Sequence, residues 1–426
     1  MKSILLLFTA FAGLALAQDK PATLLIPDAR VAIIGDSITE QKLYSKYIEC
    51  YLLACTGRSD IRCFQFGWSG ERADGFAARA VNDLAVFKPN VATTCYGMND
   101  GSYQPYNANI GGAYEKNMAR VIEQLKAAGV QKIAVGSPGG VDPDFFTRPT
   151  IKGEVYNENL AQLRDIAHKL ADQGGHAFAN VHDEMMNALP KTKAALGKGY
   201  GPFGGDGFHP APAGQLLMAA AFLKALGVDG NIGEITLDWA SGAAKATAGH
   251  EVVGNGNATA DKKSVTLSST RWPFCFDADA TQANSTRSIL PFCDFNEKLN
   301  RLVLKVPGFP AAKGKVQWGE QVKEFTQAQL QAGINLAAEF PATPFDAAFA
   351  DFMGTVGAKQ AFETGAIKNL ITNFRAFAED AKADEELGVA FDVIRKKVGS
   401  KNNDADIIVR KKLKAVKHEI SVSIAG

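Results

Sequence analysis

The sequence predicts an α/β fold in which a parallel sheet is covered by helices on both faces, followed by a second region of mixed strands and helices. Three observations support this prediction. Short apolar runs end in Gly, Pro or Asp, amphipathic segments separate these runs, and the pattern changes after residue 240. With 426 residues, of which 46% are hydrophobic, the chain can bury a sizeable core and form more than one domain.

The chain begins with "MKSILLLFTAFAGLALAQ", a lysine followed by a short apolar stretch that ends in a small-x-small pattern. This pattern is typical of a signal peptide, residues 1–17, with cleavage after Ala17. We therefore expect a secreted or periplasmic protein. No later segment offers about 18 unbroken apolar residues, so we expect no stable membrane insertion.

The first region, up to about residue 227, alternates strand-like and helical patterns. Strands buried on both faces read as continuous apolar runs, and these are expected at 30–35, 61–67, 90–97, 132–138 and 176–183. Helices with apolar residues three and four apart are expected at 43–55, 75–87, 114–129 and 156–175, and the stretch 211–227 closes the unit. In this architecture, active sites lie at the carboxyl ends of the strands.

The second region has a different pattern. We divide the chain into a first domain, residues 18–239, whose last twelve residues resemble a linker, and an accessory region, residues 240–426. Strand-like pieces dominate residues 240–345, among them a possible β-hairpin in "GKVQWGEQVKEFT", and a charged helical pattern dominates residues 346–400. This region is either a structural accessory domain or a lid that narrows the active site.

Charge and cysteine content exclude several functional classes. The formal net charge of +1 provides no basic field for nucleic acid, so no nucleic-acid partner is expected. The six cysteines are few, and their spacing does not resemble a zinc site. Cys275 and Cys293 have similar Pro-Phe-Cys contexts and form the pair we would expect if a disulfide is present. Nothing in the sequence indicates the oligomeric state.

Ser37 lies where the first expected strand ends, in "RVAIIGDSITE". A hydroxyl at the start of the next helix could be a nucleophile, because the free N–H groups there favour a developing negative charge. It could equally be a helix cap, a position that Ser and Asp both prefer. The tripeptide alone does not decide between these alternatives.

The next two strand ends supply groups that could stabilise an oxyanion. "FQFGWSGERADGF" places Gly67 and Gly70 after the second strand, and "CYGMNDG" places Asn99 after the third. Because the ends of parallel strands lie side by side, a backbone N–H of Gly70 and the amide of Asn99 could converge near Ser37. Turn-forming residues are common in such loops, which explains each of them separately but not their recurrence at one edge.

A general base is expected on a loop at the same edge. Among the six histidines, only His209 combines a Gly/Pro-rich loop, "GPFGGDGFHPAPAG", with a carboxylate three residues earlier. Asp206 could accept a hydrogen bond from one imidazole nitrogen and so direct the other nitrogen toward the serine.

The blocks "GDSITE", "GWSGER", "YGMNDG" and "DGFHP", in this order, resemble those of the SGNH (GDSL-type) hydrolases over about residues 28–227. The resemblance implies a flavodoxin-like three-layer α/β/α sandwich and hydrolysis of carboxylic esters without a metal or other cofactor. Within the family, the sequence most resembles secreted carbohydrate acetylesterases in character.

The resemblance also assigns roles to five residues. It implies that Ser37 is the nucleophile and that its backbone N–H is one oxyanion donor. It implies Gly70 and Asn99 as the other two donors, and Asp206 and His209 as the acid and base partners of the serine. Gly67 is the alternative to Gly70, since both lie in the second block.

The substrate is less closely defined by the sequence. Trp68 and Tyr103 could stack on sugar rings, and Glu71 and Arg72 could bind hydroxyl groups, although each could also serve local packing. Together with export, these residues favour O-deacetylation of polysaccharides or oligosaccharides. The alternatives are a lipase- or lysophospholipase-like esterase and a non-catalytic glycan-binding module on an esterase scaffold.

Overall fold

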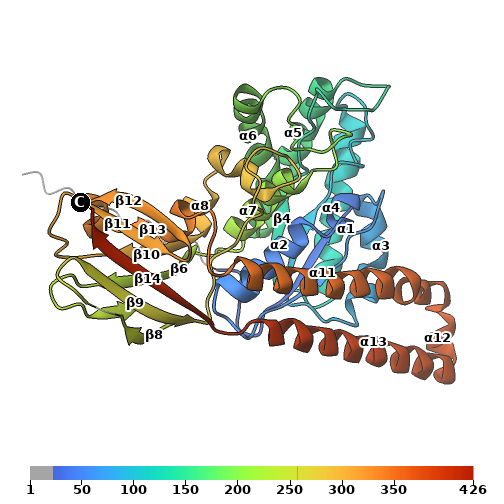
Figure 1. Ribbon diagram of the computed structural model, residues 1–426. Coiled ribbons are helices and arrows are strands. Elements are labelled where there is room, and N and C mark those ends of the chain that lie inside the picture. The colour runs from blue at the N-terminus through green and yellow to red at the C-terminus, as the bar shows by residue number, and fades with distance from the viewer. Residues whose placement is uncertain (1–22, 257, 426) are drawn as a thin grey trace, which may run out of the picture.

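The computed structural model describes residues 23–256 and 258–425. The expected signal peptide, residues 1–17, lies outside the described residues. Within them, the chain forms an α/β domain, a β-sandwich and a long helical hairpin that runs along the α/β domain (Figure 1). None of the helices in the described ranges combines the length and apolar character needed to cross a bilayer.

The α/β domain is built on a five-stranded sheet in the order β2-β1-β3-β4-β5, and every pair of neighbours is parallel. Its strands are β1 (Arg30–Gly35), β2 (Arg62–Gln65), β3 (Val91–Cys95), β4 (Lys132–Gly136) and β5 (Ala177–Ala179). The sheet is buried on both faces, as the continuous apolar runs predicted. The predicted α/β/α sandwich is confirmed.

Helices cover both faces of this sheet. They are α1 (Ser37–Glu40), α2 (Tyr44–Cys50) with the π-helical turn η1 (Tyr51–Cys55), α3 (Ala73–Leu84), α4 (Ala108–Ala127), α5 (Gly153–Gly174), α6 (Val181–Leu196) and α7 (Pro212–Ala225). Alternate residues of β1 face opposite sides of the sheet and pack against different helical layers. Val31 and Ile33 pack with α2 and α7, whereas Ala32 and Ile34 pack with α3 and α4.

The β-sandwich consists of two sheets that share one apolar core. The first has the order β13-β10-β6-β7, with β6 (Asn231–Leu237), β7 (Ala244–Ala246), β10 (Arg301–Lys305) and β13 (Ile334–Asn335). The second has the order β12-β11-β14-β9-β8, with β8 (His250–Asn255), β9 (Lys262–Ser269), β11 (Lys313–Trp318), β12 (Gln321–Thr326) and β14 (Val416–Ile424). Short helices connect these strands: η2 (Thr286–Phe292), α8 (Phe295–Leu299), α9 (Gln327–Ala332) and α10 (Leu336–Glu339).

Two predictions about the second region need correction. The segment interpreted as a linker contains β6, which pairs in parallel with β10 some seventy residues later, so the sandwich begins before residue 240. The predicted hairpin, by contrast, needs no correction, because β11 and β12 form an antiparallel pair. The second correction concerns the helical part of the region. The helical part does not end at residue 400 but continues to Lys412, after which β14 enters the middle of the second sandwich sheet.

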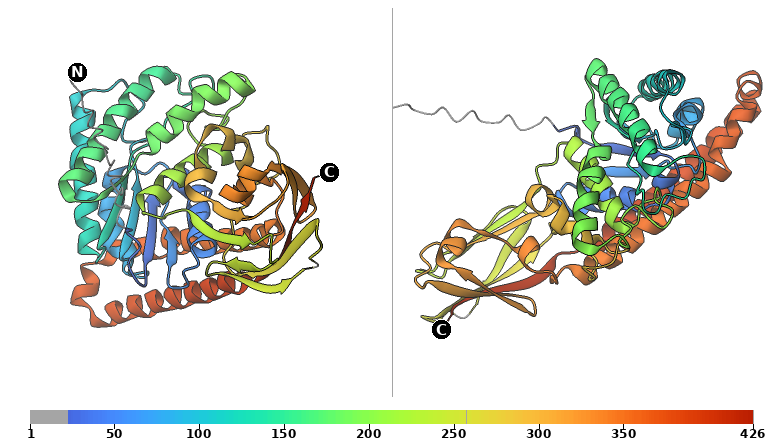
Figure 2. Two further views of the ribbon diagram at one scale, coloured as in Figure 1. Left: turned by 90° about the vertical axis from the view of Figure 1, so that its left-hand side faces the viewer. Right: turned by 90° about the horizontal axis from the view of Figure 1, so that it is seen from above.

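The helical hairpin consists of α11 (Asp346–Asn369) and α13 (Glu385–Lys412), joined by η3 (Ile371–Phe377) and α12 (Asp380–Ala383). It leaves the sandwich, runs along the α/β domain and returns (Figure 2). Helix α11 packs against α2 and the edge strand β2, and α13 packs against α11. Near the tip of the hairpin, the rings of Phe374 and Phe391 stack with centroids 4.2 Å apart.

A buried ion network joins α11 to the α/β domain. Lys359 Nζ lies 2.8 Å from a carboxylate oxygen of Glu49 and 2.8 Å from one of Glu363, and it donates to the Cys63 carbonyl at 2.7 Å. All three charged side chains are almost completely buried. Burial raises the pKa of Glu49 to about 7, although Lys359 acts in the opposite direction. The network therefore contains two carboxyl groups and one ammonium without access to water.

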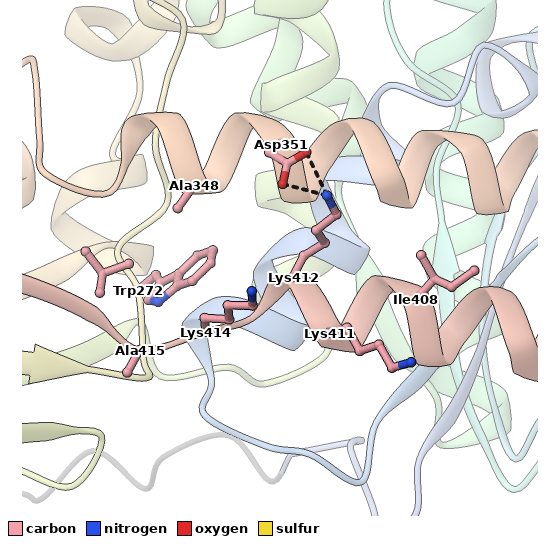
Figure 3. A pocket seen from close by; sticks show the side chains of 9 residues that line it. Trp272, Ala348, Asp351, Ile408, Lys411, Lys412, Lys414 and Ala415 are labelled. Carbon is pink, nitrogen blue, oxygen red and sulfur yellow. Dashed lines mark hydrogen bonds and ion pairs between the residues drawn. The ribbon is translucent and has the colours of Figure 1, made fainter.

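A hollow of about 670 Å³ lies where the hairpin meets the β-sandwich (Figure 3). It is lined by Trp272, Ala348, Asp351, Ile408, Lys411, Lys412, Lys414, Ala415 and Val416. One rim is closed by an ion pair, with Lys412 Nζ 2.8 Å from an Asp351 carboxylate oxygen. None of these residues lies on the strand-end loops that carry the predicted site.

The expected disulfide is not formed. All six cysteines carry free thiols. The Cys275 sulfur contacts the Pro273 carbonyl and the Thr343 hydroxyl, whereas the Cys293 sulfur contacts the Leu290 carbonyl. The similar Pro-Phe-Cys contexts therefore reflect two separate packing environments rather than a bond.

Candidate active site

Ser37 is placed at the carboxyl end of β1 by the abrupt change from a buried strand to helix α1. The capping role that competed with catalysis belongs to its neighbour, because the Asp36 side chain accepts the backbone N–H of Ile38 at 3.0 Å. The Ser37 hydroxyl instead forms a 2.8 Å hydrogen bond with Nε2 of His209. Ser37 is partly exposed to solvent.

His209 and Asp206 lie on the loop before α7 and complete a hydrogen-bonded chain. The Nδ1 atom of His209 is 2.7 Å from one carboxylate oxygen of Asp206, and the other oxygen accepts the backbone N–H groups of Phe208 and His209. Because a carboxylate only accepts, Nδ1 is the nitrogen that donates to Asp206, and in the corresponding tautomer Nε2 can accept the Ser37 hydroxyl. Partial burial would raise the pKa of Asp206, but the hydrogen bonds from His209 and Phe208 outweigh it and lower that pKa.

The loop after β4 holds the Asp206–His209 loop in place. The Asp142 N–H donates to the Gly207 carbonyl at 2.8 Å, and the Thr147 N–H donates to the Asp206 carbonyl at 3.2 Å. Gly207 has φ +80°, and a Cβ there would lie 2.6 Å from the backbone nitrogen of Phe146. A glycine is therefore required at position 207 both for its backbone angle and for the close approach of the two loops.

The two glycines after β2 have different environments. A Cβ on Gly67 would lie 2.3 Å from the backbone nitrogen of Glu40, so Gly67 allows close packing against α1. Gly70 has φ +73° and faces open space. Within residues 23–256 and 258–425, the backbone N–H groups of Ser37 and Gly70 have no hydrogen-bond partner. The Gly67 N–H also has no partner in these ranges, so the open surroundings of Gly70, and not hydrogen bonding, favour it over Gly67 as the donor.

Asn99 is oriented by contacts on both sides of its amide. Its Nδ2 donates to the Glu71 carbonyl at 3.0 Å and lies 3.5 Å from a carboxylate oxygen of Asp36. Its Oδ1 accepts the Tyr103 hydroxyl at 3.2 Å. One amide hydrogen is thus used by Glu71, and the second is left beside Asp36, the residue that precedes Ser37.

The predicted substrate contacts are not equally available. The Glu71 carboxylate is buried, with both oxygens bound by Arg79 at 2.7 and 2.8 Å, and one of them also accepts the Tyr96 hydroxyl at 2.8 Å. Glu71 therefore stabilises its loop instead of binding substrate hydroxyls, and this expectation is corrected. Arg72 is exposed and remains available.

The two aromatic candidates are also engaged in packing. Trp68 is half-buried, and its ring contacts Arg79 and the Lys368 ammonium of α11 at 4.9 and 4.8 Å. Tyr103 stacks on Tyr156 with centroids 5.0 Å apart and directs its hydroxyl to Asn99. Both rings therefore shape the loops of the site before any ligand binds.

The C-terminal hairpin also supports the site. Lys368, near the end of α11, lies 2.7 Å from a carboxylate oxygen of Glu40, and the other oxygen of Glu40 accepts the Ser69 N–H. Ser69 directly precedes Gly70. Through Glu40, the hairpin is thus connected to the loop that carries one predicted oxyanion donor. This connection could not be predicted from the sequence, because Lys368 and Glu40 are more than three hundred residues apart.

Asp36 is a feature of the site that sequence reasoning did not identify. Its carboxyl is buried beside Ser37, and burial raises its pKa to about 7, with the Asp100 and Glu71 carboxylates adding to the rise against the Ile38 hydrogen bond. Only its position next to the serine could have drawn attention to it. In the described part of the chain, no three His, Cys, Asp or Glu residues form a group that could hold a metal ion.

We expect Asp36→Asn to reduce the pH dependence of stability. An Asp in the unfolded chain titrates near pH 4, so the folded protein retains the Asp36 proton to higher pH. Stability from this group is therefore present below pH 4 and is lost as pH rises to about 7. Between pH 5 and 8, the wild type should lose about 2–3 kcal/mol more unfolding free energy than the variant. Urea unfolding at both pH values measures the difference, and equal losses would contradict the assignment.

The chain is similar to one protein family in sequence and to several solved structures in fold. Residues 33–217 match the model of the GDSL-like lipase/acylhydrolase family. The whole structure resembles a gut microbial diltiazem-metabolizing enzyme, with a TM-score of 0.68 and 20% identity over 95% of this chain and 99% of that chain. Axe2, an acetylxylan esterase from Geobacillus stearothermophilus, is similar over 48% of this chain and 96% of its own, with 22% identity and a TM-score of 0.40. No curated protein has significant sequence similarity to the chain.

Proposed function

Residues 33–217 belong to the GDSL-like lipase/acylhydrolase (SGNH hydrolase) family, and we propose that this domain hydrolyses short acyl esters of carbohydrates with Ser37 as its nucleophile. The observation that carries the proposal is the hydrogen-bonded chain from the Ser37 hydroxyl through His209 to Asp206. Esterase activity follows from the family. The roles of individual residues and the substrate are our proposal.

In the first half-reaction, Ser37 Oγ attacks the ester carbonyl while its proton passes to Nε2 of His209. Asp206 holds the ring through Nδ1 and stabilises the imidazolium that forms. The negative charge on the carbonyl oxygen is stabilised by the N–H groups of Ser37 and Gly70 and by the Asn99 amide hydrogen that otherwise makes a long, 3.5 Å contact with Asp36. As the carbon–oxygen bond of the ester breaks, His209 gives its proton to the leaving alcohol.

In the second half-reaction, water replaces the alcohol. His209 removes a proton from the water molecule as it attacks the acyl–Ser37 ester, and the same donors hold the second oxyanion. The proton then returns from His209 to Ser37 Oγ, and the carboxylic acid leaves. No group other than those of this chain and water is needed for the proton balance.

Two side chains on the loop after β2 support a saccharide as the alcohol part of the ester. Arg72 is exposed, its guanidinium has no partner among the residues that the structure describes, and the half-buried Trp68 lies on the same loop. We also propose export directed by residues 1–17. A secreted form whose intact mass corresponds to a chain starting at Gln18 would support export, and retention of the uncleaved chain would contradict it.

Hydrolysis of p-nitrophenyl acetate, butyrate and octanoate tests the proposed function. We expect kcat/KM to fall steeply with acyl length, and acetate release from acetylated xylo- and pectic oligosaccharides to follow. A rise toward octanoate would instead support a lipid-acting esterase. Absence of turnover on all three esters would favour a glycan-binding module that retains an esterase scaffold.

A further inference from the structure

Arg148 is an exposed arginine on the loop between β4 and α5. Its guanidinium carbon lies 4.1 Å from the ring centroid of Tyr103 and 4.7 Å from that of Phe208. No carboxylate in the described parts of the chain forms an ion pair with it. Arg79, by contrast, is buried and bound by two carboxylates, those of Glu71 and Asp83. Arg148 is therefore a positioned cation without a counter-ion.

The two rings beneath Arg148 belong to the candidate site. The Tyr103 hydroxyl donates to Asn99, one of the proposed oxyanion donors. Phe208 precedes His209, and the centroids of their rings are 4.4 Å apart. The Arg148 guanidinium is thus separated by a single side chain from the proposed oxyanion donor on one side and from the proposed base on the other.

The backbone next to Arg148 is fixed to the candidate site. Thr147 donates both its N–H and its hydroxyl to the Asp206 carbonyl, at 3.2 and 3.4 Å. The same loop is held at Asp142, whose buried carboxylate lies 2.7 Å from Lys193 Nζ. Because this loop is already ordered, a ligand that binds Arg148 loses little affinity to ordering the protein.

We propose that Arg148 binds a carboxylate on the alcohol part of the substrate, so that the preferred esters are short acyl esters of acidic saccharides of the uronate type. One N–H of Arg148 interacts with the Tyr103 hydroxyl. The remaining N–H groups of a guanidinium that lies on aromatic faces can still pair with a carboxylate through two parallel hydrogen bonds. The proposal rests on the proposed esterase function and specifies its substrate class.

A matched set of chromogenic esters tests this proposal. The set is p-nitrophenyl acetate, 3-carboxy-4-nitrophenyl acetate and the methyl ester of the latter, which has the same shape without the charge. In Arg148→Gln, we expect kcat/KM for the carboxylated ester to fall about 10- to 100-fold, the size of effect typical for a lost charged hydrogen bond, while the two neutral esters change by less than about threefold. Arg148→Lys should retain part of the preference for the charged ester.

Arg120→Gln is the matched control, because Arg120 is an exposed arginine on α4 and its loss changes the net charge equally. It should leave the ratio of charged to neutral rates unchanged. An equal fall on all three esters in Arg148→Gln, or no fall on any, would overturn the proposal and leave Arg148 a packing role. If the wild-type protein hydrolyses none of the esters, the esterase function itself fails, which is a distinguishable result.

Discussion

Replacing Ser37 by alanine is expected to lower kcat on p-nitrophenyl acetate by about a millionfold, the loss seen when the serine of a Ser-His-Asp arrangement is removed. The reason is that the Ser37 hydroxyl is the group hydrogen-bonded to Nε2 of His209, at 2.8 Å. Of the three hydrogen-bonded residues Ser37, His209 and Asp206, Ser37 is therefore the one whose oxygen forms the acyl intermediate. The oxyanion donors remain in the variant, so a small residual rate above that of water is expected. Stopped assays with purified variant and long incubation measure it.

Ser400→Ala provides the control, because Ser400 is an exposed serine on α13, outside the loops of the candidate site. It should retain activity within about threefold, as surface substitutions usually do. Ser37→Ala should also unfold at the wild-type urea midpoint, which separates lost chemistry from lost folding. Undiminished turnover in Ser37→Ala would reject this residue as nucleophile.

Lys359→Met is expected to lower the free energy of unfolding by about 3–5 kcal/mol at pH 8, the usual result of removing one partner from a buried ion pair. It leaves the Glu49 and Glu363 carboxylates buried without the ammonium that lies 2.8 Å from each. The loss should be smaller at pH 5, where a carboxyl group whose pKa is about 7 is protonated and carries no charge. Urea unfolding at the two pH values measures both effects.

A second substitution distinguishes charge from packing. Lys359→Met combined with Glu49→Gln should recover part of the lost stability, since it removes one of the two unpaired charges. Lys382→Met is the exposed control, because its partner Glu379 and Lys382 itself are mostly solvent-accessible, and it should have little effect. A loss in Lys359→Met that does not depend on pH would contradict the electrostatic explanation.

The α/β domain and most of its site could be predicted from local signals. Strand ends in a parallel sheet meet at one edge, so Ser37, Gly70 and Asn99 were expected together, and the three-residue spacing of Asp206 and His209 suits one short loop. Hydrogen bonds join Ser37, His209 and Asp206, and Asn99 contacts Asp36 and Glu71, the neighbours in sequence of Ser37 and Gly70. The distinction between Gly67 and Gly70 required coordinates, because it depends on the distance between β2 and α1.

Other features depend on partners distant in the sequence. From the sequence, Glu71 is expected to be an exposed loop residue. In the structure it is buried together with Arg79, eight residues later, with which it forms an ion pair. Strand β6 reads as a linker because its partner β10 follows some seventy residues later. Arg148 carries no motif, and its place beside the site results from the hydrogen bonds of Thr147 to the Asp206 carbonyl. No pattern within a window of residues contains this information.

The position of β14 has a consequence for the order of events during biosynthesis. This strand, Val416–Ile424, lies between β11 and β9 in the second sandwich sheet, so that sheet is split into two pieces until the ribosome has passed residue 424. Residues 23–227 can meanwhile emerge and fold as a unit. The second sandwich sheet cannot be completed until β14 has been synthesised. Until then, the unpaired edges of β11 and β9 can pair with wrong strands. We therefore expect slow steps and chaperone dependence in the maturation of this protein to reside in the sandwich and not in the domain that carries Ser37.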